Sequence, residues 1–426
     1  MPTELKLRRG TTAQHSTFTG ASGEITVDTS KKTLVVHDGS TAGGVPLATE
    51  AAVNAKQNSD AELTTLAGMS ANRATFLASS EGFGFRNRII NGDMRIDQRN
   101  NGASISLLSA AGYAVDRWNT VAFGGAAGGF SAQRVTDAPA GFTNSLRITT
   151  TTADASITAA DNYQLLHQIE GFNTADLGFG TATASAVTLS FWVKSSLTGT
   201  HSGSLLNGPD NRSYVFTFTV NAANTWEYKT VTIAGDTTGT WNTDNSVGIS
   251  VRFNLGGGSN FQGTPGSWAG VSLYAATGAV QLVGTLNATL QLTGVQLEAG
   301  SVATPFERRD YGRELIMCQR YYQKSYNVTT PPGTVTNDGY FQSFAHNAFT
   351  LQQTSLRFPV FMRANPTVTL FSPSNGASGV VFDVLAGVNR SCGVFNTGNS
   401  GGEINGSGNL TAGNYYTFHF VANIEL

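Results

Sequence analysis

Charged side chains are scarce in this sequence. They make up 13% of its 426 residues, against about 25% in an ordinary globular protein. The formal net charge is −2, and no run of Lys or Arg is longer than two residues. A nucleic-acid-binding protein needs clustered cations that displace the counterions of the phosphate backbone. We therefore expect no nucleic-acid partner.

Long apolar runs and cysteine pairs are lacking as well. No stretch reaches the roughly 20 apolar residues that a membrane-spanning helix needs, and the opening MPTELKLRRG lacks the apolar segment of a secretory signal. The two cysteines, Cys318 and Cys392, are too few for a disulfide framework. These absences predict a protein that inserts into no membrane and is made and assembled in a cytoplasm.

The residues that are abundant favour β-structure. Glycine occurs 49 times, Thr, Ser and Asn are frequent, and hydrophobic residues make up 40% of the chain. This hydrophobic share is enough for real cores, and β-branched and aromatic residues suit the pleated surface of a sheet. A mainly β protein of several domains is the expected class.

An early hairpin is predicted to have an apolar face that its own residues do not cover. Residues 23–47 read GEITVDTSKKTLVVHDGSTAGGVPL, in which Ile25 and Val27 share one face of a strand and Leu34 and Val36 share one face of the next. An isolated hairpin is at best marginally stable in water. Its apolar face therefore needs cover from elsewhere.

Residues 49–85 are predicted to form a short helical stalk. Ser59 and Glu62 have the spacing of a capping box, and Leu63 and Leu66 follow at helical spacing. So narrow an apolar stripe suits contact with copies of itself around an axis. The alternative is a linker helix that lies on a neighbouring domain.

The rest of the chain divides into β-rich stretches around one helix. Residues 86–309 alternate short apolar strands with turn residues, which predicts a β-sandwich or jelly roll. In VTLSFWVK (187–194), alternate residues from Val187 form an apolar face that leaves Trp192 and Lys194 on the other face. Residues 310–325 are predicted to form a connecting helix, with Tyr311, Leu315, Cys318 and Tyr322 at helical spacing. Residues 326–426 return to strands and form a second, smaller β-domain.

Aromatic residues in polar surroundings are the candidate sugar-binding residues. A sugar places its C–H face on a flat ring while polar neighbours take its hydroxyl groups. Each of these side chains could instead belong to a core or to a contact between copies. The candidates in the larger β-module are Trp192, Trp241 and Trp268. In the smaller β-domain, a polar–aromatic cluster that could reach a tip is predicted from Tyr340, Phe341, His346 and Asn347.

No catalytic motif is expected to be active. GNSGG (398–402) fits the nucleophile pattern G-x-S-x-G, but it lies in a loop rich in Gly and Asn rather than between a strand and a helix. Carboxylate pairs that could hydrolyse glycosides are available, but sequence does not give their separation. No fixed-period repeat typical of capsule-degrading β-helices is present. We expect a protein that is not an enzyme.

Several segments resemble bacteriophage proteins. LKLRRGTTAQHSTFTGASGEITVDTSKKTLVVHDGSTAGGVPLA (5–48) resembles the N-terminal repeat of phage tail fibres and receptor-binding tail proteins. NRIINGDMRIDQRNNG (87–102) and LTGVQLEAGSVATPFERRDYGRELIMCQRYYQ (292–323) resemble a widespread tail-fibre module. FPVFMRANPTVTLFSP (358–373) is similar to the distal domain attached to that module.

The resemblance implies an elongated homotrimeric fibre, in which the apolar face of the hairpin would be covered by the other copies. Three copies would bury the hairpin faces around a common axis, at roughly 1.5–3 kcal/mol for each fully buried side chain. The implied fibre consists of an N-terminal β-hairpin segment (1–48), a helical stalk (49–85), a jelly-roll module (86–309), a connecting helix (310–325) and a C-terminal β-sandwich domain (326–426). The implied trimer interface comprises Ile25, Val27, Leu34, Val36, Leu63 and Leu66.

The central module also looks like carbohydrate-binding jelly rolls. In those relatives, residues near the first and last strands can share a structural calcium ion. The positions to inspect here are Asn91, Asp93, Asp97 and Glu298, since Ca²⁺ prefers six to eight oxygen ligands. The alternative is a turn at Asn91-Gly92-Asp93 with surface acids, and no other cofactor is expected.

The function that the resemblance implies is attachment of a virion to a host cell. The N-terminus would join a phage tail or baseplate protein, and the β-domains would bind bacterial surface polysaccharide, either lipopolysaccharide or capsule. The protein would be located in the virion, as a tail fibre. Two alternatives remain: a tail-associated polysaccharide depolymerase, and a purely structural fibre or adaptor that carries another receptor-binding protein.

Overall fold

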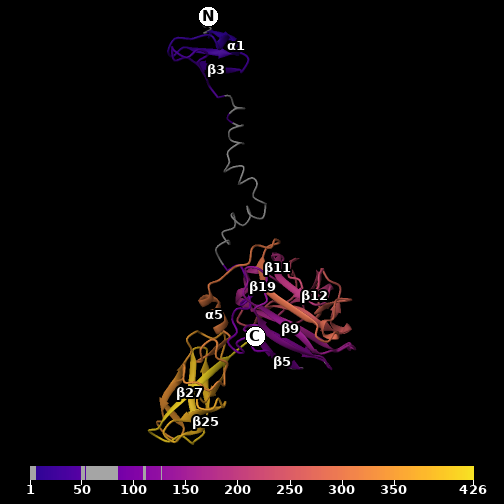
Figure 1. The fold of residues 1–426 in the computed structure, drawn as a ribbon, viewed down its shortest axis with the longest axis vertical. Coiled ribbons are helices and arrows are strands. Elements are labelled where there is room, and N and C mark those ends of the chain that lie inside the picture. The colour runs from indigo at the N-terminus through magenta and orange to yellow at the C-terminus, as the bar shows by residue number, and fades with distance from the viewer. Residues whose placement is uncertain (1–5, 49–52, 54–84, 109–111, 126) are drawn as a thin grey trace. The chain divides into compact units, whose positions relative to one another are not determined.

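The computed structural model describes residues 6–48, 53, 85–108, 112–125 and 127–426. The chain forms two compact units, Met1–Gly84 and Phe85–Leu426, which are treated separately (Figure 1). Most of the expected stalk, including Leu63 and Leu66, lies outside the described residues. Among the described residues, no helix is both long enough and apolar enough to cross a membrane.

The N-terminal unit is a small sheet built on the expected hairpin. The hairpin strands β2 (Ile25–Asp28) and β3 (Thr33–Val36) are antiparallel, with Ile25 opposite Val36. The sheet order is β1-β2-β3-β4, and β1 runs parallel to β2. Within residues 6–48, the other elements are β1 (Arg9–Gly10), α1 (Thr12–His15) and β4 (Val45–Pro46).

A single line of hydrogen bonds runs beneath one face of this hairpin. The Gly20 N–H donates to Nδ1 of His37 (3.3 Å), so Nε2 of a neutral His37 donates to the Thr26 hydroxyl (2.9 Å). That hydroxyl donates in turn to Nε2 of His15 (2.9 Å), whose Nδ1–H donates to the carbonyl of Thr11 (3.1 Å). His15, Thr26 and His37 are buried. This face is therefore covered within the unit by polar side chains.

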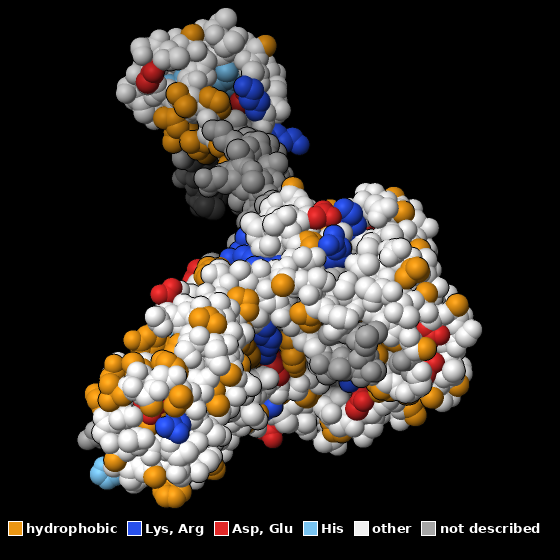
Figure 2. Space-filling view, turned by 60° about the horizontal axis from the view of Figure 1, so that its bottom comes forward, with side chains coloured by type: hydrophobic (Ala, Val, Ile, Leu, Met, Phe, Trp, Pro, Cys, Tyr) orange, Lys and Arg blue, Asp and Glu red, His pale blue; other side chains and the backbone are white. Residues whose placement is uncertain are grey.

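The opposite face of the hairpin is apolar and uncovered by described residues of the unit. Ile25 is 43% exposed and Leu34 is 38% exposed. Val27 and Val36 on the same face are half-buried. The exposed residues Leu7, Val45 and Leu47 add to the hydrophobic surface of the unit, which gathers on one side of it in Figure 2. The expected apolar face is present, and it remains in need of cover.

Residues 86–309 form the expected β-sandwich. The seven-stranded sheet contains, in spatial order, β17 (Trp268–Ala269), β13 (Ser213–Val220), β12 (Gly199–Asn207), β15 (Val247–Gly257), β10 (Asn162–Glu170), β7 (Trp118–Phe123) and β6 (Gly112–Val115). The six-stranded sheet contains β14 (Glu227–Ile233), β11 (Val187–Ser195), β19 (Thr289–Ala299), β9 (Ser145–Thr152), β8 (Gly129–Val135) and β5 (Ile105–Leu108). A separate pair, β16 (Gln262–Gly263) and β18 (Ala275–Ala276), lies in the segment between β15 and β19. Short 3-10 helices are η2 (Gly171–Asn173), η3 (Ala175–Leu177), η4 (Ser259–Phe261) and η5 (Leu282–Gly284).

The core lies between the two sheets and follows the alternation in the sequence. Val187, Leu189, Phe191 and Val193 of β11 are fully buried. Phe191 meets Phe253 of β15 edge to face, with ring centroids 5.1 Å apart. Such edge-to-face pairs add to the stabilisation that burial alone provides. The expected inward face of 187–194 is confirmed, so its other face points away from the core.

The connecting helix is shorter than expected. Helix α5 spans Tyr311–Gln319, and the Asp310 side chain accepts a hydrogen bond from the Arg313 N–H (2.9 Å) as its N-terminal cap. Tyr322 lies in strand β20 (Tyr322–Lys324), which pairs with β27 (Tyr415–Asn423) of the distal sheet. Strand pairing therefore replaces the last predicted turn. Tyr311 is 46% exposed, so it lies outside the buried face of the helix.

The distal β-domain is built around β27. The order of its sheet is β20-β27-β24-β25-β26-β22, and two further strands also pair with β27. Tyr416, Phe418 and Phe420 of β27 are buried in the distal core. The other strands are β21 (Phe341–Phe344), β22 (Thr350–Arg357), β23 (Thr367–Phe371), β24 (Val380–Asp383), β25 (Val388–Gly398) and β26 (Gly401–Gly406).

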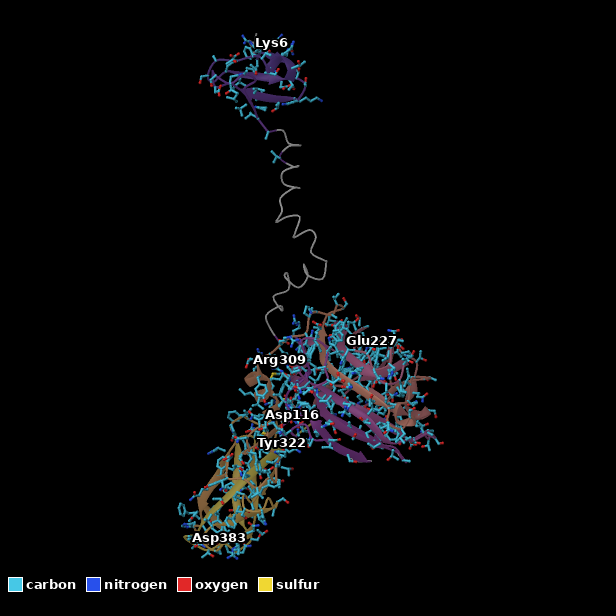
Figure 3. All side chains as sticks on the ribbon, viewed as in Figure 1. Lys6, Asp116, Glu227, Arg309, Tyr322 and Asp383 are labelled. Carbon is cyan, nitrogen blue, oxygen red and sulfur yellow. The ribbon has the colours of Figure 1, made fainter. Side chains whose placement is uncertain are left out.

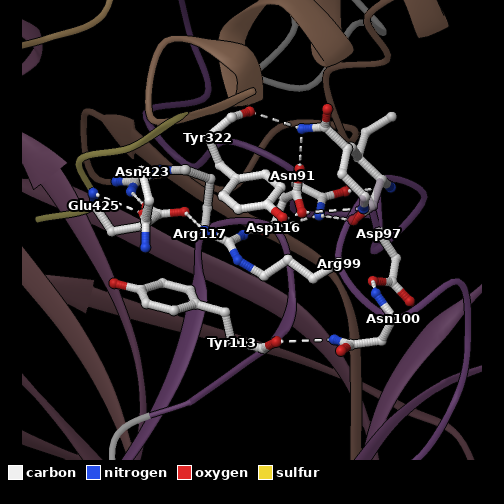
Figure 4. A network of polar contacts seen from close by, with 12 residues as sticks. Asn91, Asp97, Arg99, Asn100, Tyr113, Asp116, Arg117, Tyr322, Asn423 and Glu425 are labelled. Carbon is white, nitrogen blue, oxygen red and sulfur yellow. Dashed lines mark hydrogen bonds and ion pairs between the residues drawn. The ribbon is translucent and has the colours of Figure 1, made fainter. Parts of the chain in front are cut away.

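A buried ionic network joins the distal domain to the sandwich (Figures 3 and 4). Arg99 donates to Asp116 (3.2 Å) and to Glu425 (2.8 Å). Arg117 also donates to Glu425, and its guanidinium lies 3.5 Å from the ring centroid of Tyr321. Burial raises the pKa of Asp116, although the charge of Arg99 opposes this shift. The carboxylate of Glu425 therefore bridges two guanidinium groups of the sandwich.

Candidate functional site

The outer face of the six-stranded sheet carries two neighbouring aromatic rings, one exposed and one half-buried. Trp192 of β11 points away from the core, as the alternation predicts, and is half-buried. Tyr228 of β14 lies opposite Trp192 in the strand pairing and is 43% exposed. Their ring centroids are 5.4 Å apart. Together they form a small aromatic surface that solvent reaches.

A bulge at Gly294 of β19 brings a third ring beside them. The pairing of β11 with β19 shifts register between Ser190 and Trp192, and Gly294 has a φ of +61°. A Cβ atom added to Gly294 would lie 2.6 Å from the Phe142 ring and 3.2 Å from the Trp192 ring. Both rings therefore lie against the bare backbone of this glycine, which only glycine allows.

Phe306 and Arg308 extend this surface beyond Phe142. The rings of Phe142 and Phe306 meet edge to face at 5.3 Å. The Arg308 guanidinium lies over both of them, 4.7 Å from the centroid of Phe142 and 5.9 Å from that of Phe306. We call the four rings of Tyr228, Trp192, Phe142 and Phe306 the aromatic row.

A line of polar side chains runs across the same sheet beside the aromatic row. Lys194 of β11 lies opposite Gln291 of β19, which lies opposite Arg147 of β9, and Arg147 lies opposite Gln133 of β8. We call these four residues the polar row. Lys194 is two residues from Trp192 on the same strand face, so the two rows are about 7 Å apart.

Asp137 lies in a loop and forms hydrogen bonds with side chains of the polar row. Its carboxylate accepts hydrogen bonds from Lys194 (2.8 Å), Gln291 (3.1 Å) and the indole N–H of Trp226 (3.2 Å). The hydrogen bond from Lys194 is the main reason that the pKa of Asp137 lies below its usual value. Asp137 therefore stays ionised at neutral pH and fixes the side chains beside the aromatic row.

This arrangement suits a ligand with an apolar face and a polar edge. Flat rings offer dispersion contact and an electron-rich surface to C–H groups. The ammonium and guanidinium groups alongside them donate hydrogen bonds, and the amide groups both donate and accept them. A sugar ring has this combination of an apolar face and an edge of hydroxyl groups. The aromatic row and the polar row together offer a ligand of this kind an apolar surface beside hydrogen-bonding groups.

The structure places Trp241 and Trp268 outside this surface. Their rings meet each other edge to face at 5.3 Å and both pack against Phe179. Their indole N–H groups donate to the carbonyls of Thr238 (3.1 Å) and Ala234 (2.7 Å). Contacts within the sandwich account for both side chains, so the candidate site includes Trp192 alone of the three.

The distal candidates do not form one cluster. Tyr340 and Phe341 lie at the start of β21, and the Phe341 ring stacks on Phe418 at 6.0 Å. His346 and Asn347 lie in the turn beyond its other end, where the Asn347 side chain accepts from the backbone of the next strand. At about 3.3 Å per residue, the strand separates the two pairs by more than 10 Å.

The expected calcium residues are engaged by protein donors. Asn91 bonds the backbone at Ile96 through both ends of its amide (2.8 and 2.9 Å). Asp93 pairs with Arg95 through Oδ2 (2.5 Å), whereas its Oδ1 is buried with no hydrogen-bond partner among the described residues. Asp97 accepts the N–H groups of Asn100 (2.9 Å) and Gly102 (2.5 Å), and Glu298 accepts the N–H (2.9 Å) and hydroxyl (2.6 Å) of Thr304. In the part of the chain that the structure describes, no three His, Cys, Asp or Glu side chains are grouped to hold a metal ion. A calcium site here stays a prediction.

The outer face of the seven-stranded sheet is largely closed by another part of the chain. The N–H of Ala276 in β18 donates to the Ser202 hydroxyl (3.1 Å), and the N–H of Leu273 donates to the Ser213 hydroxyl (3.1 Å). Asn254 of β15 is buried on this face. The polar side chains there are covered, which leaves the six-stranded sheet as the more accessible face.

Comparison with known proteins identifies the N-terminal unit. Residues 5–41 match the family model described as the major tropism determinant N-terminal domain. The chain is 71% identical over 48 residues to the tail fiber receptor-binding protein of Bordetella phage BPP-1. That match covers 11% of this chain and 13% of the relative, so it concerns the N-terminal unit and not the whole protein.

Two solved structures align with about half of the chain at low similarity. The tailspike protein 4 enzymatically active domain of bacteriophage CBA120 is 11% identical, with a TM-score of 0.28, over 50% of this chain and 21% of that one. A family 11 carbohydrate-binding module from Clostridium thermocellum is 11% identical, with a TM-score of 0.24, over 47% of this chain and 98% of that one. Neither alignment bears on what this chain binds. Residues 5–41 are therefore similar to the major tropism determinant N-terminal domain, and 48 residues of the chain are similar to a phage tail fibre receptor-binding protein.

Proposed function

We propose that this protein is a phage tail fibre component that attaches the virion to a bacterium by binding a cell-surface glycan. The N-terminal match supports the tail fibre assignment, because the relative that carries this segment is a tail fibre receptor-binding protein. By this proposal the N-terminal unit joins the phage tail or baseplate. Lipopolysaccharide and capsule are the surface glycans in question.

The aromatic row is the observation that carries the glycan assignment. Tyr228 is exposed and Trp192 is half-buried on the outer face of a sheet, and Asp137 accepts hydrogen bonds from polar side chains beside them. Holding rings and polar groups in place before the ligand arrives reduces the entropy lost on binding. Weak single sites would suffice if several copies act together in one fibre.

We further propose that three copies associate through the apolar face of the N-terminal hairpin. Ile25 and Leu34 are the most exposed residues of that face within the hairpin strands. Their side chains would leave water on association, at up to about 1.5–3 kcal/mol each. The resulting fibre would be a virion component that is assembled in the host cytoplasm.

The glycan proposal is tested with Trp192→Ala and Tyr228→Ala in the full-length protein. Each substitution removes one ring of the aromatic row, so binding to purified host polysaccharide should weaken about tenfold. Phe361→Ala is the matched control, since Phe361 is an exposed ring (68%) in the distal domain. Equal binding by all four proteins would exclude the aromatic row as the binding site.

The same preparations separate the alternative functions. New reducing ends in the polysaccharide after incubation would identify a depolymerase instead of a binding protein. Failure of the free protein to block phage adsorption, together with absent glycan binding, would identify a structural fibre or adaptor.

A further inference from the structure

We infer that the glycan bound along the aromatic row is anionic, with a carboxylate or phosphate group on the sugar that stacks there. This inference rests on the proposed function, and it adds the chemical class of the ligand. Its basis is an excess of cationic side chains around the aromatic row that protein carboxylates do not neutralise. The chain as a whole carries a net charge of −2, so its composition alone would not predict a basic site.

Arg308 is the first of these cations. Its guanidinium lies over Phe142 and Phe306 at the end of the aromatic row, and its side chain is exposed. Among the described residues, no carboxylate forms an ion pair with it. A guanidinium that stacks by its face keeps its N–H groups in the plane of the group, where a carboxylate or phosphate can accept two of them.

Arg147 is the second cation, and it belongs to the polar row. One of its terminal nitrogens donates to the neutral side chain of Gln133 (3.0 Å). Within the described part of the chain, no ion pair involves Arg147. It lies on β9 next to Gln291 of β19, so its charge faces the ligand side of the sheet.

The acidic side chains nearby already form ion pairs with lysines of the protein. Asp137 accepts hydrogen bonds from Lys194, Trp226 and Gln291, so its charge is balanced by that of Lys194. Glu227 at the edge of the sheet pairs with Lys229 (2.6 Å). Arg147 and Arg308 therefore remain as two uncompensated positive charges beside the aromatic row.

The two arginines flank the position where a sugar would stack. Phe142 lies in the loop that leads into β9, and it packs between Arg308 and Trp192 beside the bulge at Gly294. A sugar lying on Trp192 and Phe142 would place its substituents near one arginine or the other. A neutral sugar would use their N–H donors weakly, whereas an anionic sugar would form charge-assisted hydrogen bonds.

The test compares charged and neutral forms of the same polysaccharides. A panel of purified bacterial capsules and O-polysaccharides is used native, after reduction of uronic acid carboxylates to alcohols, and after removal of phosphate. Binding of the full-length protein is measured at low and at high salt. Loss of binding after carboxylate reduction or after phosphate removal identifies which anion is recognised.

Arg147→Gln and Arg308→Gln should each weaken binding of the native glycan by about tenfold or more, as expected when one charge-assisted hydrogen bond is removed. Affinity for the neutralised glycan should stay unchanged, and the salt dependence should shrink because fewer charges contribute. Arg313→Gln on the exposed surface of α5 is the matched control.

The outcomes separate this inference from the proposed function. Equal affinity for native and neutralised glycans, with loss of both in Trp192→Ala, would overturn the anionic class while leaving glycan binding in place. Absence of any glycan binding, or binding that Trp192→Ala does not change, would overturn the proposed site itself. Binding only at concentrations far above those of a fibre on a cell surface would overturn both.

Discussion

At the scale of single residues, the site depends on one position without a side chain. Gly294 lets Trp192 and Phe142 close over β19, and its φ of +61° is one that other residues adopt at a cost. The alternation in 187–194 was enough to predict that Trp192 faces outward. Nothing in the sequence near Trp192 indicated Phe142, which is fifty positions away and arrives through a loop.

We expect Gly294→Ala to damage both stability and binding. The methyl group would overlap the Phe142 ring, so overpacking should cost about 1–3 kcal/mol in addition to the strain of the positive φ. Chemical denaturation and glycan binding measure the two effects. Gly278→Ala is the control, because Gly278 also has a positive φ (+78°) but has no atom within 4 Å of an added Cβ. Equal losses in both variants would mean that backbone strain, and not the packing of the rings, explains the effect.

At the scale of elements, strand periodicity predicted which face of a strand is apolar, but the sequence did not predict where each element ends. Strand β11 lies where period two predicts, because one of its faces lies in the core of the sandwich. The alternation of the N-terminal hairpin is also present, but its apolar face is exposed. The helix α5 ends at Gln319, since Tyr322 gains a strand partner in β27 that a local pattern does not reveal. Strand β21 likewise separates Phe341 from His346. Their closeness in the sequence had suggested that these two residues belong to one cluster.

The junction between the sandwich and the distal domain also depends on contacts that sequence does not show. Glu425 lies more than 300 residues from Arg99 and Arg117, yet its carboxylate is shared between them. Substituting Glu425→Gln would remove the carboxylate that pairs with the buried guanidinium of Arg117, and it would leave Arg99 paired with Asp116 alone. We expect a loss of about 3–5 kcal/mol in the free energy of unfolding of this unit.

Urea denaturation of the full-length protein measures this loss. Glu403→Gln is the matched control, because Glu403 lies exposed on β26 and accepts only an amide hydrogen bond from Asn396 (3.0 Å). A change within about 0.5 kcal/mol for Glu425→Gln, as is usual for surface substitutions, would show that the network contributes little.

At the scale of the whole molecule, composition and periodicity were enough to predict a mainly β protein with an uncovered hairpin face. The structure leaves that face uncovered within the N-terminal unit, as Ile25 and Leu34 show.

The double substitution Ile25→Asp with Leu34→Asp should abolish association through the hairpin. Two carboxylates would have to lose their hydration on this face, which costs more than the apolar contact returns. Light scattering should change from three times 44.8 kDa to 44.8 kDa. Ser22→Asp with Lys31→Asp adds the same number of carboxylates at exposed polar positions and should leave the mass unchanged. A wild-type mass of 44.8 kDa would refute the trimer.

The chain crosses twice between the sandwich and the distal domain. It leaves the sandwich through α5 and β20, and it returns when β27 ends and Glu425 meets the two arginines. A domain that is held by one connection can rotate about it, whereas a domain that is held at two separate points cannot rotate freely. A load applied to the distal domain is therefore shared between a covalent path and an ionic one, and both connections fix the direction of this domain relative to the sandwich.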